Sequence, residues 1–562
     1  MIHAVDPRQN RLFDPFDGVI SPVGRRIIAK GWQGILRHVL LEVMPVAKLG
    51  QHFSDSLGAP TKELYSMAGL VFLADFFGWT AHDAVEAYIF RSDVQYALNL
   101  EPGAEVSSRT VERYQRLFRE DDLAASVFDE VTTRLIKILD LDVSRQRLDS
   151  THVFSHMASF GRTKLMAVAI KRFLTQVKRH ELATYTALPE ELRRRYEPAQ
   201  ARLFADAKDA EARARCRQQA AEDLRFVIDH CADHADLANR STYKALVTIF
   251  GQQCVLSGGK VVVKAKTGGD CVQNPSDPDA TYDGKKGQGY QVQIAETCVP
   301  GNDVQLITAA QPQTASESDA HAVTPMLDQL EQAGRLPEEL LADTAYTGDE
   351  NVQAAAARDV DLVGPVPGRT PEVSPETLTV DDFARDERTD MIDACPAGHA
   401  PTSCTRDAET ATTRFEMPAS ACAECPFRRQ CPIHSTGDGK FTFEFTDKEC
   451  RLAGRRVEEE TPVFAERYAP RSGIESTNSG LKNRLGVGSL SVRGLKSVSR
   501  VLLHKLAGWN VLRASASQKL KAWVASRVAE TLGTSDCEGP GSVFHGLVWL
   551  VDRQISVFCR VA

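Results

Sequence analysis

The pattern of apolar and polar positions divides the chain into helical stretches and one region of strands. Residues 59–90 carry apolar residues at helical spacing with few β-type signals, and similar texture continues to about residue 140. We therefore predict a helical N-terminal domain over 1–140. Ser107 or Ser108 can cap a helix whose polar side carries arginines. That helix is either a DNA-reading helix or an ordinary surface helix, and the pattern alone favours neither.

Short β-type runs dominate the region that follows. The run RQRLDSTHVF ends at Phe154 and holds Asp149 in its middle, while no glycine occurs between Gly161 and Gly251. Further strands are predicted at 260–266, 290–297, 303–308, 336–343 and from 361, with a turn at 300–303 and a helix over 317–333. This order predicts an α/β fold in which a mixed sheet is flanked by helices.

These patterns divide the chain into five parts. We predict an N-terminal helical DNA-binding domain, a first core part with a helical insertion at 160–250, a linker and cysteine-rich insertion, a C-terminal core part with basic helices, and a tail without an assigned role. Their bounds are 1–140, 141–370, 371–445, 446–530 and 531–562. In the fourth part Leu495, Val498, Leu502, Leu506 and Trp509 form an apolar stripe, with Lys496, Arg500 and His504 opposite.

The distribution of charge changes the meaning of the total. The formal net charge is -8, which by itself argues against a nucleic-acid partner. From Arg467 to Arg527, however, twelve Lys or Arg accompany a single acid, Glu475, so this window carries +11 and the rest of the chain -19. A local positive field attracts phosphates whatever the total charge. The chain has no run of eighteen apolar residues and no secretory signal pattern, so we expect a cytoplasmic protein with no membrane partner.

Three acidic residues lie in unusual positions. Asp149 lies inside a β-type run, Asp343 ends one, and Glu475 is the lone acid in the basic window. Each has an ordinary explanation: a turn, a helix cap, or an i,i+4 pair with Arg471. Together they can bind divalent ions, since carboxylate oxygens are the ligands that Mg²⁺ prefers and phosphodiester chemistry depends on charge neutralisation.

A spaced motif favours this second interpretation. Tyr468-(2)-Arg471-(3)-Glu475-(6)-Lys482 resembles the Y-(2)-R-(3)-E-(6)-K pattern of DDE transposases of bacterial insertion sequences. ADTAYTGDEN around Asp343 resembles the second acidic block of that family, with Ala345 and Tyr346 in the small and aromatic places, and LDSTHVF resembles the first. NPSDPDATY, with Asp277 and Asp279, resembles relatives that carry a helical insertion and a cysteine segment.

The resemblance implies a ribonuclease H-like core and a nucleoid-associated enzyme that cleaves insertion-sequence ends and transfers the 3′-hydroxyl into target DNA. It implies catalysis by Asp149, Asp343 and Glu475 with two Mg²⁺ or Mn²⁺ ions. Its partners would be double-stranded DNA, as terminal inverted repeats and target, and further copies of the chain in a homodimer or higher oligomer. It also implies DNA contacts by Tyr468, Arg471 and Lys482 of the motif. The basic window extends the predicted DNA contacts to Arg484, Arg493, Lys496 and Arg500.

Five of the thirteen cysteines cluster between Cys395 and Cys431. The spacing Cys422-(2)-Cys425 suits two ligands on one zinc knuckle. We predict a structural zinc site formed by Cys395, Cys422, Cys425 and Cys431, with Cys404 and His434 as alternates; the other interpretation is reduced cysteines in a loop.

Two rival functions remain on sequence grounds. One is another ribonuclease H-like metal nuclease, and the other is a catalytically inactive, transposase-derived DNA-binding protein. Hydrolases of two other classes are disfavoured, because the chain has neither an HExxH zinc motif nor a G-x-S-x-G elbow.

Overall fold

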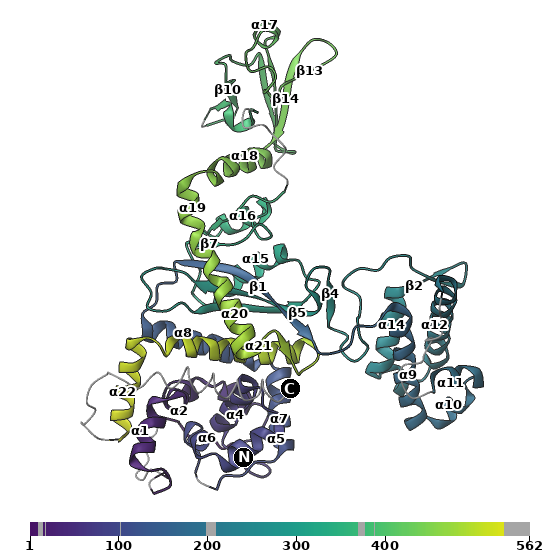
Figure 1. The fold of residues 1–562 in the computed structure, drawn as a ribbon, viewed down its shortest axis with the longest axis vertical. Helices are drawn as coiled ribbons and strands as arrows, with labels where there is room; N and C mark the ends of the chain where they lie inside the picture. The colour runs from purple at the N-terminus through teal and green to yellow at the C-terminus, as the bar shows by residue number, and fades with distance from the viewer. Residues whose placement is uncertain are drawn as a thin grey trace.

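The computed structural model of the 562-residue chain describes residues 1–8, 15–16, 18–101, 103–197, 209–368, 377–386, 388–389 and 391–532. A central sheet carries helices on both faces, and two further units project from it in different directions (Figure 1). The protein is thus a mixed α/β structure, which confirms the predicted class at that level. Of the predicted tail 531–562, all but the first two positions lie outside the described residues.

The central sheet is mixed. Its strands follow the order β4 (Thr281–Asp283), β5 (Gly287–Thr297), β1 (Arg145–Ser155), β7 (Glu339–Leu341) and β8 (Asp361–Val363); β6 (Ile307–Thr314) pairs with β5, and β15 (Ser489–Leu490) pairs with β1. Strands β1, β7 and β8 are parallel, whereas β5 runs antiparallel to β1. β1 is central because its alternate side chains enter two different cores: Leu148 packs in one and Val153 in the other.

Helices cover the two faces of this sheet. On one side lie η3 (Asp319–Ala322), α15 (Val323–Gln332) and α16 (Asp349–Ala356), and on the other lie α20 (Gly473–Leu485), α21 (Leu495–Ala514) and α8 (Leu123–Leu139) (Figure 1). α15 ends as predicted before Gly334, whose φ of +65° suits a residue without a side chain.

Two strand predictions are wrong in detail. The segment 260–266 yields β3 (Lys260–Val263), which pairs with β2 (Cys254–Ser257) in a separate hairpin and does not join the central sheet. Gly258 and Gly259 both have positive φ and turn the chain directly back onto β2. Strand β6 begins at Ile307, later than predicted, next to a shift of register between Ala295 and Glu296.

The N-terminal region is helical, as its texture predicts. Its elements are α1 (Pro22–Lys30), α2 (Trp32–Ile35), η1 (Leu36–Leu40), η2 (Leu41–Val43), α3 (Val46–Gly50), α4 (Leu64–Phe77), α5 (Ala81–Phe90), α6 (Ser92–Ala97), α7 (Ser108–Glu120) and α8. Ser107 caps α7, because its hydroxyl accepts the Thr110 N–H. All of these helices except α1 share one continuous core with α21 and with the face of β1 and β5 that holds Val153, whereas Ala29 of α1 packs in a small separate cluster.

The glycine-free stretch forms a unit with its own core. It comprises α9 (Arg162–His180), α10 (Leu182–Ala187), α11 (Glu190–Tyr196), α12 (Ala210–Cys231), α13 (Ala235–Ala238) and α14 (Ser241–Gln253). Figure 1 shows this unit beside the sheet, reached from the ends of β1 and β4.

A second unit contains the clustered cysteines. Its elements are η4 (Val380–Asp382), β9 (Ala384–Arg385), β10 (Ile392–Ala394), β11 (Ser403–Asp407), β12 (Thr412–Met417), α17 (Ala419–Ala423), β13 (His434–Ser435) and β14 (Phe441–Thr446). The chain returns to the sheet through α18 (Asp447–Glu459), α19 (Pro462–Tyr468) and η5 (Ala469–Ser472), and after α21 it enters α22 (Gln518–Leu532) (Figure 1). In the part of the chain that the structure describes, no helix is long and apolar enough to cross a membrane.

The predicted polar side of α21 is right for Lys496, which is exposed, and wrong for Arg500 and His504. Arg500, His504 and Lys505 are all buried, because the N-terminal helices pack against the face that the sequence assigns to solvent. Arg500 and His504 bind Asp75 of α4, and Lys505 donates to the carbonyls of Phe76 and Leu485. The helix is therefore a buried connector between the N-terminal helices and the sheet.

Candidate active site

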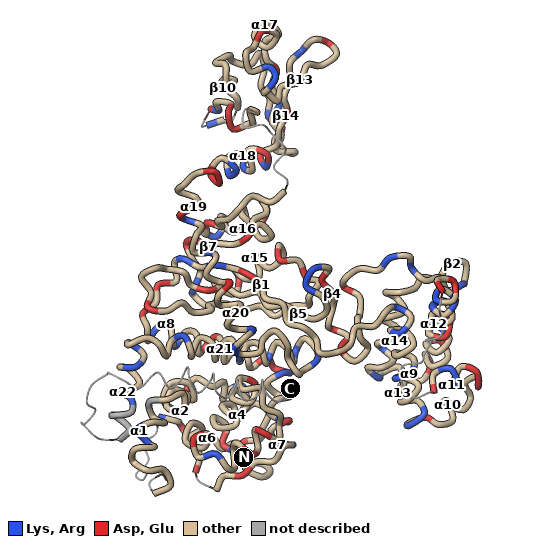
Figure 2. The backbone as a smooth tube through the Cα atoms, in the orientation of Figure 1, with Lys and Arg blue, Asp and Glu red and all other residues tan. Residues whose placement is uncertain are grey.

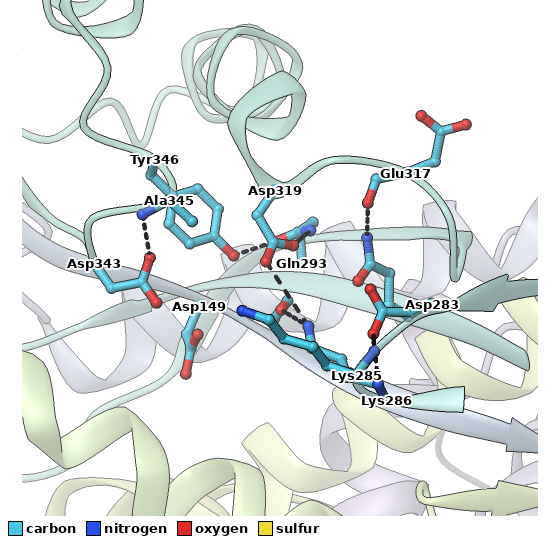
Figure 3. Close-up of polar contacts among 12 residues, drawn as sticks. Asp149, Asp283, Lys285, Lys286, Gln293, Glu317, Asp319, Asp343, Ala345 and Tyr346 are labelled. Carbon is cyan, nitrogen blue, oxygen red and sulfur yellow. Dashed lines mark hydrogen bonds and ion pairs between the residues drawn. The ribbon is translucent and has the colours of Figure 1, made fainter. Parts of the chain in front are cut away.

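Asp149 and Asp343 lie at matching positions on two neighbouring parallel strands. Arg147 of β1 pairs in register with Leu341 of β7, and each aspartate follows two residues later. Because side chains alternate along a strand, both carboxylates project from the same face of the sheet. β7 ends at Leu341, so Asp343 sits where the strand gives way to a loop. Figure 3 shows the two carboxylates adjacent to each other.

The third carboxylate arrives on the helix that crosses this face. Glu475 lies in the first turn of α20, four residues after Arg471 of η5. The Arg471 Nη2 atom lies 3.3 Å from Asp149 Oδ1 and 3.3 Å from Asp343 Oδ2, and its Nη1 atom lies 3.4 Å from Glu475 Oε1. One guanidinium therefore contacts all three acids, which sequence separations of more than 100 residues keep apart in the chain.

The three carboxylates differ in their surroundings. The side chain of Asp149 is only 16 % exposed, that of Asp343 is 41 % exposed and that of Glu475 is 70 % exposed. Burial raises the pKa of Asp149, and the neighbouring Asp343 and Asp319 act in the same direction, while Arg471 opposes them. Asn478 of α20 donates a hydrogen bond of 3.0 Å to Asp149 Oδ2. A nearby cation therefore stabilises the ionised form of Asp149 against the cost of burial.

Residues 394–514 match a family model described as a transposase DDE domain. The matched segment holds Tyr468, Arg471, Glu475 and Lys482, and it also holds the four cysteines predicted to bind zinc. It does not extend to Asp149 or Asp343, which reach Arg471 only through the fold. No curated protein and no solved structure matches the chain.

The donor chemistry of Asp149, Asp343 and Glu475, the acidic triad, fits a hard divalent cation. Three carboxylates converge on one positive group, and oxygen donors of this kind are the usual ligands of Mg²⁺ and Mn²⁺. Among the described residues, no three His, Cys, Asp or Glu side chains are already arranged around a metal position. Arg471, whose side chain is 14 % exposed, lies between the acids instead. Its contacts of 3.3–3.4 Å are longer than strong charge-assisted bonds, so the guanidinium is not tightly locked to any one acid.

The predicted DNA contacts within residues 394–514 differ in their exposure to solvent. Four of them are exposed on α20 and around the start of α21, where Figure 2 shows Lys and Arg positions: Lys482, Arg484, Arg493 and Lys496. Tyr468 is half-buried and stacks on Phe464, with ring centroids 5.6 Å apart.

Arg500 does not fit the same prediction. Its side chain is buried and donates two hydrogen bonds of 2.9 Å to Asp75 and one of 3.0 Å to the Gln115 carbonyl. A guanidinium used in this way cannot reach a phosphate on the surface, so its sequence position misled the assignment.

Asp277 and Asp279 have a role that spacing could not reveal. Asp277 accepts hydrogen bonds from the Gly494 N–H, Ser155 and Tyr290, and Asp279 accepts one of 2.8 Å from the Leu495 N–H. Both carboxylates thus cap the N-terminus of α21, where the helix dipole favours negative charge. They join the end of β1, β5 and the start of α21, and their hydrogen-bond partners among the described residues do not include Asp149, Asp343 or Glu475.

Sequence reasoning missed three residues next to the triad. A polar cluster lies on the side of Asp149 away from Asp343 (Figure 3). It consists of Asp319 of η3, Gln293 of β5 and Lys286, which directly precedes β5. The sequence pattern places Gln293 in a strand and Asp319 near a helix start, and neither position carries a signal of chemistry. A buried Gln at an inward strand position, followed by an Asp before a helix, is a pattern that could have drawn attention.

The four predicted zinc ligands line one small cavity together with His399. Cys404 and His434, the alternates, lie on β11 and β13. Burial raises the pKa of Cys422, and the nearby Cys431, Cys395 and Cys425 add to this effect. The thiols thus gather in one place, but within the described residues they are not arranged around a metal position. The zinc site stays a prediction.

Proposed function

We propose that this protein is an insertion-sequence transposase that cleaves the ends of its element and joins the freed 3′-hydroxyls to target DNA. The observation that carries the proposal is the contact of one guanidinium, Arg471, with Asp149, Asp343 and Glu475. The match of residues 394–514 to a transposase DDE domain supports the same proposal. So does the arrangement that a ribonuclease H-like core requires: the first acid on the first strand, the second at a later strand, and the glutamate on a following helix.

The reaction consists of two in-line displacements at phosphorus. In the first, water attacks the phosphodiester at the element end, the bond from phosphorus to the 3′-oxygen breaks, and a 3′-hydroxyl and a 5′-phosphate result. In the second, that hydroxyl attacks a target phosphodiester and displaces its 3′-oxygen. Neither step needs a covalent protein intermediate.

The residues of the chain divide this work. Asp149, Asp343 and Glu475 would hold divalent ions, which when bound neutralise the negative charge that develops at phosphorus. Asn478 orients Asp149 through a 3.0 Å hydrogen bond. Arg471 balances the acids before DNA arrives and can then turn to a phosphate, because its contacts are loose. Lys482 and Arg484, exposed in the last turn of α20, suit the phosphates beyond the cleavage point.

The test uses the full chain and duplex DNA that carries the inverted repeats flanking its gene. Asp149→Asn, Asp343→Asn and Glu475→Gln should each abolish Mg²⁺-dependent cleavage while leaving binding of the end largely intact. Glu466→Gln is the matched control, since Glu466 is exposed on the preceding helix α19. Cleavage by all three variants at the wild-type rate would refute the proposal.

Two other outcomes would identify the rival functions. End binding without cleavage by the wild-type chain in Mg²⁺ or Mn²⁺ would indicate an inactive, transposase-derived DNA-binding protein. Cleavage of branched or unrelated DNA, with no joining of ends, would indicate another metal nuclease.

A further inference from the structure

A second cation faces the triad region from the side opposite α20. Lys286 lies at the tip of the hairpin that joins β4 and β5, and its ammonium reaches Ser150, the neighbour of Asp149, at 3.0 Å. Arg471 approaches Asp149 from η5, directly before α20. Two cations from different elements thus reach consecutive residues of β1: the Arg471 guanidinium contacts Asp149, and the Lys286 ammonium contacts Ser150.

The hairpin tip is stiffened by its own backbone. The Asp283 carboxylate accepts the N–H groups of both Lys285 and Lys286, which closes the turn. Gly289, with a φ of +149°, lets β5 run so close to β1 that an added Cβ would stand 2.2 Å from the Val153 carbonyl oxygen. Lys286 is thus delivered to β1 from a defined direction.

A buried chain of hydrogen bonds aims the ammonium. The Tyr346 hydroxyl donates to Gln293 Oε1 at 2.6 Å, and Gln293 Nε2 donates to Asp319 Oδ1 at 2.7 Å. The other Asp319 oxygen faces Lys286 Nζ at 3.8 Å. Tyr346 lies three residues after Asp343, whose Oδ1 accepts the Ala345 N–H at 2.9 Å. Through Lys286 and Ser150, these contacts link the loop that holds Asp343 to β1, the strand that holds Asp149.

Lys286 has donor capacity that these contacts do not use. An ammonium has three N–H donors, and one goes to Ser150. The separation of 3.8 Å from Asp319 is too long for a hydrogen bond, and the Lys286 side chain is 36 % exposed. The remaining donors can therefore reach a ligand that comes to the triad from solvent.

We propose that Lys286 binds a phosphate of the DNA strand at the triad, and that Asp319, held by Gln293 and Tyr346, is the positioning residue that aims it. The inference rests on the proposed function, since it assumes a DNA substrate. The Asp149, Asp343, Glu475 and Asp319 carboxylates repel a DNA phosphate, and cations on both sides of it would weaken this repulsion. Arg471 of η5 and the exposed Lys482 and Arg484 of α20 lie on one side. Lys286 supplies one on the other side.

The experiment measures single-turnover cleavage by the full chain on duplex ends that carry one neutral methylphosphonate at each position near the scissile bond. Lys286→Ala should slow cleavage of the unmodified end roughly 10- to 100-fold, a loss typical of a charge-stabilising contact. At one position the methylphosphonate should slow cleavage by the wild type as much as Lys286→Ala slows cleavage of the unmodified end. At that position it should not slow cleavage by Lys286→Ala any further. Lys286→Arg should restore part of the rate, and Asp319→Asn should have no added effect when combined with Lys286→Ala.

Control variants separate this proposal from folding defects and from the proposed function. Lys285→Ala, in the same turn and exposed, should cleave at close to the wild-type rate. If Lys286→Ala fails to fold, Lys286→Gln is used in its place, because glutamine keeps a long polar side chain without the charge. Wild-type rates in the Lys286 variants, or independent losses at every methylphosphonate position, would overturn the inference. With Glu475→Gln inactive in the same assay, that result would leave the transposase proposal standing.

Discussion

The Asp75 carboxylate on α4 accepts two hydrogen bonds of 2.9 Å from the Arg500 guanidinium on α21, across a sequence separation of 425 residues. His504 Nδ1 lies 2.7 Å from the same carboxylate. Burial acts to raise the pKa of Asp75, but His504 and Arg500 outweigh it and lower that pKa. The cluster joins the N-terminal helices to the helix that supports the sheet face carrying the triad.

Removing the acid alone should destabilise the protein strongly. Asp75→Asn leaves a buried guanidinium without its counter-charge, which typically costs about 3–5 kcal/mol. The midpoint of thermal unfolding should fall well below that of Glu86→Gln, an exposed control on α5. Replacing both partners, Asp75→Leu with Arg500→Met, should lower the midpoint less than Asp75→Asn does. An unchanged midpoint for Asp75→Asn would contradict the ion pair as a structural joint.

The contrast between this pair and the triad shows what the sequence can predict. Asp149 and Asp343 were found because a strand pattern surrounds each acid, and parallel pairing then places them side by side. Arg500 was misplaced because helical periodicity describes one helix at a time. It assigns the polar side of α21 to solvent and carries no information about Asp75 on a distant helix. Lys286 and Asp319 were missed for a related reason: the turn and the helix start that hold them resemble ordinary surface features.

Lys505 provides a pH-dependent test of the same joint. Burial lowers the pKa of its ammonium to about 8 from an ordinary value of 10.5, and Asp75 opposes the shift. In the unfolded chain the ordinary value applies, so between pH 8 and 10.5 the unfolded state binds more protons than the folded state. The contribution of Lys505 to the free energy of unfolding is therefore lowest below pH 8. It rises with pH between 8 and 10.5, by on the order of 3 kcal/mol.

Lys505→Met removes the titrating group and should not show this rise. The midpoint of the wild type, measured relative to the variant, should increase as the pH is raised from 7.5 to 10. Lys137→Met, on an exposed position of α8, controls for other groups that titrate in the same range. A difference between wild type and Lys505→Met that is independent of pH would show that the ammonium is not buried as described.

The fork shape of Arg471 is expected to matter more than its charge. Two of its nitrogens reach three carboxylates, whereas a lysine presents a single point charge. Arg471→Lys should therefore slow cleavage roughly 100-fold, the scale of losing one charge-stabilising donor, and Arg471→Ala should slow it further. Binding of the DNA end should change much less than the cleavage rate.

Arg456→Lys, on α18, is the matched control for this substitution. Comparing binding by fluorescence anisotropy with single-turnover cleavage separates the two effects. A cleavage rate of Arg471→Lys equal to that of the control would mean that the three contacts do not organise the acids.

The cysteine unit allows a direct test of its predicted zinc ion. Cys395, Cys422, Cys425 and Cys431 line one cavity, and the Cys395 N–H donates to the His399 carbonyl at 2.9 Å in a tight turn. The unit also has an apolar core with Phe383, Phe415 and Phe445, so it could fold with or without metal. Zinc would bind the thiols as thiolates and reverse the rise in the pKa of Cys422, which makes binding weaker as the pH falls.

Purified protein should contain about one zinc ion per chain by mass spectrometry, as a closed four-thiolate site requires. Cys422→Ser should lose that ion and lower the unfolding midpoint, and chelator should lower the midpoint of the wild type. Cys404→Ser is the control, since Cys404 lies on β11 opposite Phe415, and it should retain zinc. If the protein holds no zinc after growth with the metal and chelator leaves its midpoint unchanged, the aromatic core alone stabilises the unit.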